Sequence, residues 1–217
     1  MPGQLLHLAV AQSIIDEFNP QDRAQYYLGA IAPDAIHAFA NAKRSRRISS
    51  HLMADDMPMH ESDNIETKAT AVRLYLNAEN DMPMLKSFKL GYCIHVLTDI
   101  YWLKTIYLNF LSLDPLKDME ITESDKIYYY EMDKSSYDLL INEKWKSEVF
   151  KLLSDATAPK AFPAVTAEEI NEWCRRTLHW YDAFESTHTE PARYILPKDI
   201  QNFLKGSKNY IIESLNT

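Results

Sequence analysis

The fold is decided by the stretch Gly91-Tyr92-Cys93-Ile94-His95-Val96-Leu97-Thr98-Asp99. His95 and Asp99 are four residues apart, so a helix would carry both side chains on one face. The run from Met84 to Leu111 is apolar nearly all round, as is typical of a helix enclosed by other helices. The stretch therefore predicts an all-α protein, a multi-helix bundle around a buried central helix that carries His95 and Asp99.

The polar pair on this helix needs a partner. A buried, unpaired carboxylate is costly or becomes protonated, so Asp99 requires a cation, a network of donors or a metal. His95 is the natural second ligand. Gly91, one turn earlier, has no side chain and leaves room for an ion or for a closely packed helix.

The composition limits the possible functions. The chain has 217 residues, only 4 of them glycine, which favours one helical domain over residues 1–217. Its formal net charge of −8 argues against a nucleic-acid-binding face. The one basic cluster consists of Lys43, Arg44, Arg46 and Arg47. These charges suit a solvated surface, although they would also attract a phosphorylated substrate.

The ends and the cysteines of the chain indicate a cytoplasmic protein. Two cysteines, Cys93 and Cys174, imply no disulfide framework. The first residues lack the basic and apolar regions of a secretory signal. His95, Asp99 and Lys104 interrupt the most apolar segment, so we expect no transmembrane helix.

Periodicity and capping signals predict where the helices lie. We expect a short apolar loop at 29–34 and an irregular polar segment at 41–64. A capping box at Thr166 and Glu169 should begin the helix that reaches Phe184. Helices are predicted at 5–18, 22–28, 65–78, 84–111, 122–153 with a break near Asn142, 166–184 and 197–215.

Three further polar residues have both a structural and a functional interpretation. His7 lies on the apolar face of the first helix, where a core histidine commonly donates to a backbone carbonyl. Asp34 would cap a helix that begins at Ala35. His51 follows two serines and would be exposed in a polar loop. Each of the three is also a possible metal ligand.

The functional interpretation rests on the convergence of these residues. Zinc takes histidine nitrogen and carboxylate oxygen in a four-coordinate shell, which would be filled by Asp34, His51, His95 and Asp99. If His7 approaches as well, Asp99 could bridge to a second ion, with a water molecule as nucleophile. One or two zinc ions are expected, and other divalent transition metals would suit the same ligands.

The order of these motifs resembles the bacterial zinc-dependent phospholipase C family, in particular its shorter, apparently intracellular members. The resemblance rests on His7, Gly29-Ala30-Ile31-Ala32-Pro33-Asp34, Ser50-His51 and the stretch from Gly91 to Asp99, which span about half of the chain. It implies an all-helical phosphoesterase that holds zinc with histidines and aspartates. By position, it also implies that His7, Asp34, His51, His95 and Asp99 are the ligands.

The chain departs from that family beyond the helical pair. Secreted members continue with further histidines and a glutamate for another zinc, whereas here no histidine follows until His179. The segment Tyr128-Tyr129-Tyr130-Glu131-Met132-Asp133 resembles the shorter members, and Glu131 or Asp133 could complete a second metal position or contact substrate. His37 and His60 are near the predicted ligands in sequence and could touch substrate too.

These observations predict a zinc-dependent hydrolase of a small phosphoester or phospholipid, similar to phospholipase C. Asp34 is the expected general base or ligand, because it approaches from outside the central helix. Arg46 or Arg47 would neutralise phosphate charge. The alternative is a non-catalytic helical binding or scaffold protein whose His/Asp core holds a structural metal or is hydrogen-bonded.

Overall fold

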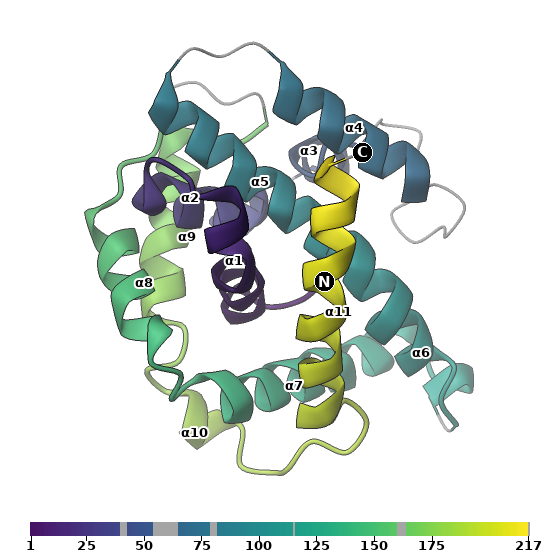
Figure 1. The fold of residues 1–217 in the computed structure, drawn as a ribbon. Helices are drawn as coiled ribbons and strands as arrows, with labels where there is room; N and C mark the ends of the chain where they lie inside the picture. Colours follow the sequence, from purple (N-terminus) through teal and green to yellow (C-terminus); the bar gives the residue numbers. More distant parts are fainter. Residues whose placement is uncertain (40–42, 54–64, 79–81, 115, 160–163, 217) are drawn as a thin grey trace.

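The computed structural model describes residues 1–39, 43–53, 65–78, 82–114, 116–159 and 164–216. Every regular element within these ranges is a helix, which confirms the predicted all-α class. The helices pack around one large apolar core (Figure 1).

The first half of the chain supplies the elements that carry the polar cluster, which consists of His7, Asp34, His51, His95 and Asp99. Helix α1 is closed by Asn19, which adopts a left-handed conformation with φ 40° and bonds back to Ile15. Helix α2 begins at Asp22, whose side chain accepts from the Gln25 backbone N–H at 3.0 Å. The elements are α1 (Gln4–Phe18), α2 (Arg23–Ile31), η1 (Ala32–His37), α3 (Arg44–Ser50), α4 (Ile65–Asn77) and α5 (Pro83–Trp102).

The second half surrounds these helices. The predicted capping box at Thr166 is confirmed, because Thr166 and Glu169 each accept the other's backbone N–H. The elements are η3 (Leu103–Tyr107), α6 (Leu108–Leu111), η4 (Leu116–Asp118), α7 (Ile121–Leu140), α8 (Trp145–Asp155), α9 (Ala167–His179), α10 (Phe184–Thr187) and α11 (Pro197–Asn216).

Helix α5 is the centre of the fold, as predicted. It runs diagonally across the molecule in Figure 1 and packs against α1, α2, α4 and α11. His95 and Asp99 are buried on it. The helix continues beyond Trp102 through a π-helical turn, η3, into α6. The segment predicted as one helix over 84–111 is therefore helical throughout, with a π-helical turn at Leu103–Tyr107.

Several predicted boundaries and local assignments are wrong. Residues 44–50 form a short helix inside the segment predicted to be irregular. The apolar stretch at 29–34 is helical, not a loop, although it is buried as expected. Asp34 lies in the first turn of η1 and does not cap a helix at Ala35. The helix that begins after Thr166 ends at His179, five residues before Phe184.

The cysteines and the lengths of the helices bear on the expectations of no disulfide and no transmembrane helix. Cys93 and Cys174 are both buried and free. Among the described residues, no helix has the length and apolarity needed to cross a membrane.

Candidate metal centre

The crossing of α2 and α5 fixes His95. A β-carbon at Gly91 would lie 1.9 Å from the Tyr26 carbonyl oxygen, and Gly29 is closed in by the α5 backbone in the same way. The two helices therefore touch through their backbones. This contact brings the Ala30 carbonyl to 2.8 Å from His95 Nδ1. Since a carbonyl only accepts, Nδ1 carries the proton and Nε2 is left to face the cluster.

The end of α3 positions His51 in a similar way. Its Nδ1 donates to the Arg47 carbonyl at 3.0 Å, which again turns Nε2 inward. Leu52 follows with φ 57°, a conformation that usually needs glycine, and closes the helix in a Schellman motif. The Tyr92 hydroxyl, from α5, donates to the Ser50 carbonyl and ties this turn to the central helix. His51 is thus buried, and the expectation of an exposed loop histidine is wrong.

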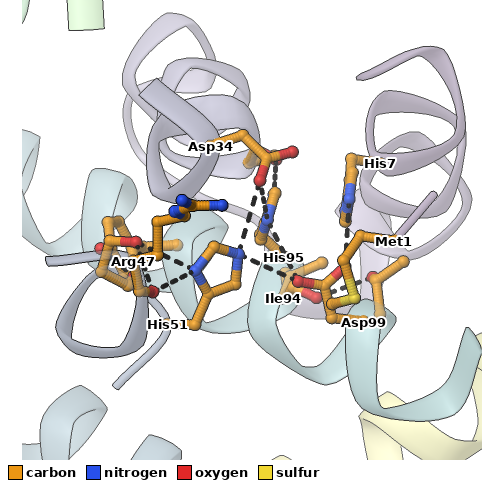
Figure 2. A network of polar contacts seen from close by, with 12 residues as sticks. Met1, His7, Asp34, Arg47, His51, Ile94, His95 and Asp99 are labelled. Carbon is orange, nitrogen blue, oxygen red and sulfur yellow. Dashed lines mark hydrogen bonds and ion pairs between the residues drawn. The ribbon is translucent and has the colours of Figure 1, made fainter. Parts of the chain in front are cut away.

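His7, Asp34 and Asp99 complete the cluster (Figure 2). The rings of His7 and His95 stack with centroids 3.7 Å apart. Neither nitrogen of His7 has a hydrogen-bond partner among the described residues, so the expected bond to a backbone carbonyl is absent from that part of the chain. The measured separations are His7 Nε2 to Asp99 Oδ1 3.4 Å, His51 Nε2 to Asp34 Oδ1 3.4 Å, His51 Nε2 to Asp99 Oδ2 3.2 Å, His95 Nε2 to Asp99 Oδ2 3.5 Å and His95 Nε2 to Asp34 Oδ1 3.9 Å.

The ligand atoms of these residues lie close to the spacing of a zinc shell. Ligand atoms at about 2.0–2.1 Å from a tetrahedral zinc ion are about 3.3 Å from one another. Four of the six pairs among Asp34, His51, His95 and Asp99 are 3.2 to 3.9 Å apart. Two triads that share His95, one with His7 and Asp34 and one with His51 and Asp99, have ligand atoms within 4.8 Å of one another. Within the described residues, Nε2 of both histidines and both oxygens of Asp99 are buried without a hydrogen-bond partner. The donor set and its unpaired atoms therefore fit a bound cation.

The electrostatics of the cluster point the same way. Burial alone would raise the pKa of Asp99, but the adjacent His95, His51 and His7 hold it well below its usual range. Burial also opposes ionisation of Asp34, yet His95 and His51 lower its pKa to about 2. Burial would lower the pKa of His51, and the two carboxylates instead raise it to about 10. The cluster attracts positive charge, whether a proton on His51 or a metal ion.

A cavity of about 430 Å³ opens beside the cluster. This volume is within the usual range for a small-molecule site. Asp34 and His51 reach the cavity, whereas His95 and Asp99 lie behind them. Its wall is formed by Met1, Pro2, Gly3, Gln4, Asp34, His37, Arg47, His51, Leu103, Tyr107, Asp125, Tyr129, Met132, Asp133, Trp173 and Trp180.

The two acids proposed for a second metal lie in different places. One oxygen of Glu131 accepts the backbone N–H groups of Arg193, Tyr194 and Ile195 at 2.6, 2.6 and 3.1 Å. Its burial is explained by these bonds, and it does not line the cavity. Asp133 does line the cavity, on the wall formed by α7.

Of the residues predicted to contact substrate, some line the cavity and others do not. Arg47 and the exposed His37 line the cavity. Arg46 instead pairs with Glu169 at 2.8 Å and donates to the Ala164 carbonyl, which joins α3 to the start of α9. His60 lies outside the described residues.

Sequence reasoning missed the aromatic and acidic wall of the cavity. Tyr107, Tyr129, Trp173 and Trp180 lie there, with Asp125 beside them. Asp125, Tyr129 and Asp133 follow one another at intervals of four and share one face of α7. That spacing was visible in the sequence, but only the fold turns this face toward the cluster.

Comparison with known proteins supplies one match. A family model described as zinc dependent phospholipase C matches residues 6–184, which is most of the chain. No match was found among curated proteins or solved structures.

Proposed function

The chain belongs to the zinc-dependent phospholipase C family, and from that premise we propose that it is a zinc-dependent hydrolase of a phosphoester, with phospholipids as the first substrate class to test. One observation carries the proposal. Ligand atoms of Asp34, His51, His95 and Asp99 are 3.2–3.9 Å apart in four pairs, close to the spacing around a four-coordinate zinc ion, and Asp34 and His51 line a cavity of substrate size.

The four residues would hold one zinc ion, and His7 with the other oxygen of Asp99 offers part of a second position. Zinc supplies Lewis acidity, which polarises a phosphoryl oxygen and lowers the pKa of a water molecule to about 7. The backbone carbonyls of Ala30 and Arg47 orient the two histidines for this task.

Asp34 is the residue best placed to act on the attacking water. Its Oδ1 faces His51 and His95, but its side chain also borders the cavity and retains 13% exposure, against 4% for Asp99. An ionised carboxylate at that edge can accept a proton from water as the oxygen approaches phosphorus. We therefore assign Asp34 the general-base role in addition to ligation.

Arg47 is the cation assigned to the substrate phosphate. It lines the cavity together with Asp34 and His51. Arg46 does not line the cavity, and its guanidinium pairs with Glu169. A positive side chain at the cavity wall would offset the phosphate charge near the two ligand carboxylates.

One observation favours a second candidate function. The raised pKa of His51 means that a protonated His51 would itself offset part of the negative charge of Asp34 and Asp99. The cluster would then be a polar core within a non-catalytic binding protein.

Elemental analysis followed by a phosphodiesterase assay separates these two functions. Protein purified without a metal-affinity tag should contain at least one equivalent of zinc, which the His95→Ala variant lacks. Asp34→Asn should keep the helical circular dichroism and lose about a hundredfold in turnover. Asp16→Asn, an exposed change of the same charge on α1, is the control. A folded wild-type protein that takes up no zinc on titration would favour the polar-core alternative.

A further inference from the structure

Asp133 lines the same cavity as two residues of the metal cluster. It belongs to α7, whereas Asp34 and His51 belong to η1 and to the end of α3. The carboxyl group packs against the backbone near the start of the chain, since a β-carbon at Gly3 would lie 3.1 Å from Asp133 Oδ1. A substrate bound in this cavity would therefore have both Asp34 and Asp133 in the wall around it.

The surroundings of Asp133 differ from those of other acids on α7. Asp138, one turn further on, is ion-paired with Lys134 at 2.7 Å. Glu131 is satisfied by three backbone N–H groups. In the described part of the chain, Asp133 makes neither an ion pair nor a hydrogen bond, although it is half-buried. The carboxyl group is therefore free to interact with a ligand in the cavity.

Burial raises the pKa of Asp133 to about 7, and the Met1 amino group opposes this rise. The other titratable groups that sense its charge are the phenols of Tyr129 and Tyr181, which remain neutral at this pH. Asp125, Arg47 and His37 share the cavity wall. A carboxyl group in this state is present in both protonated and ionised forms near neutrality, as proton transfer requires.

We propose that Asp133 is the general acid that protonates the leaving oxygen of the phosphodiester. This assignment rests on the proposed function. As the water oxygen bonds to phosphorus, one of its protons passes to Asp34. The bond between phosphorus and the leaving oxygen breaks, and that oxygen takes the Asp133 proton and departs as an alcohol. The proton held by Asp34 and the proton lost by Asp133 are then exchanged with solvent, which restores both groups.

The test compares two substrates that share a phosphocholine group. Dihexanoyl phosphatidylcholine releases an alkoxide, which needs a proton, whereas 4-nitrophenyl phosphocholine releases a phenolate that is stable without one. Asp133→Asn should lower kcat about a hundredfold for the lipid and by less than about fivefold for the nitrophenyl ester. The alkaline limb of the kcat/KM profile for the lipid should also disappear.

Asp125→Asn is the matched control, because it removes a carboxylate from the same helix face and cavity. It should leave the ratio of the two substrate activities at the wild-type value. Two measurements do not depend on turnover. The zinc content of Asp133→Asn should equal that of the wild type, and carbon-13 NMR of the labelled carboxyl should show Asp133 titrating near neutral pH.

The outcomes distinguish the two proposals. Equal losses on both substrates, or loss of zinc from Asp133→Asn, would overturn the general-acid assignment and leave the proposed function standing. Zinc-loaded wild-type protein that cleaves neither ester would overturn the proposed function, and the assignment with it.

Discussion

Asp99 and Glu131 are both buried carboxylates on long helices, but their surroundings are opposite. One oxygen of Glu131 accepts three backbone N–H groups from residues 193–195. Both oxygens of Asp99 face histidine nitrogens in geometries that make no hydrogen bond within the described residues. Within the described residues, the polypeptide satisfies Glu131 by itself and leaves both oxygens of Asp99 without a hydrogen bond. Burial of an acid therefore identifies a candidate metal ligand only when its partners are also known.

The largest loss of stability should come from Gly91→Ala, which disturbs the helix crossing that positions His95 beside Asp99. The new β-carbon would lie 1.9 Å from the Tyr26 carbonyl oxygen, so α2 and α5 must separate and the bond from His95 to Ala30 is lost. We expect a loss of more than about 4 kcal/mol in the free energy of unfolding, or failure to fold. The free energy of unfolding is measured by urea titration monitored by circular dichroism.

Gly206→Ala is the control for that change. Its β-carbon would meet the Tyr101 hydroxyl at 2.0 Å, but this is the end of a side chain that can move, and alanine favours the helix. Its effect should stay within about 1 kcal/mol. A Gly91→Ala protein of wild-type stability would contradict the close crossing on which the geometry of His95 depends.

The next largest effect separates the two acids directly. Glu131→Ala leaves three backbone N–H groups without their acceptor, so the free energy of unfolding should fall by about 3 kcal/mol while zinc content stays unchanged. Asp99→Ala should instead abolish zinc binding. The comparison requires elemental analysis and urea unfolding of both variants. Loss of zinc from Glu131→Ala would restore the hypothesis of a second metal at that position.

The sequence predicted the centre of the fold better than its edges. The apolar run around His95 and Asp99 identified the buried helix, because periodicity alone places both residues on one face. The helix at 44–50 was missed because three arginines and three serines around the single apolar residue Ile48 carry little apolar pattern. The burial of His51 depends on Tyr92 and on the left-handed turn at Leu52, which no local signal predicts.

The cavity wall shows the same limit. Glu131 and Asp133 are two residues apart and were equivalent candidates in the sequence. In the fold, Glu131 accepts the backbone N–H groups of residues 193–195, whereas Asp133 lines the cavity. Only long-range packing decides between them, so a motif can name the segment but not the residue that acts.

The smallest effect is expected for Asp133→Asn, which tests the ionisation of Asp133 through the free energy of unfolding alone. The pKa of Asp133 is about 7 in the folded protein because of burial, and about 3.9 in an unfolded chain. Between these values the folded state binds more protons than the unfolded state, so the Asp133 contribution to stability falls as pH rises. From pH 5 to pH 8, wild type should lose about 2–3 kcal/mol relative to Asp133→Asn. Urea unfolding at both pH values gives this difference, in which titration of the shared metal ligands cancels.

Asp138→Asn, whose carboxylate is ion-paired on the surface of α7, should follow the wild type within about 0.5 kcal/mol at both pH values. A difference between wild type and Asp133→Asn that does not change with pH would show that the Asp133 carboxyl ionises normally, and that its position in the cavity wall does not prepare it to carry a proton.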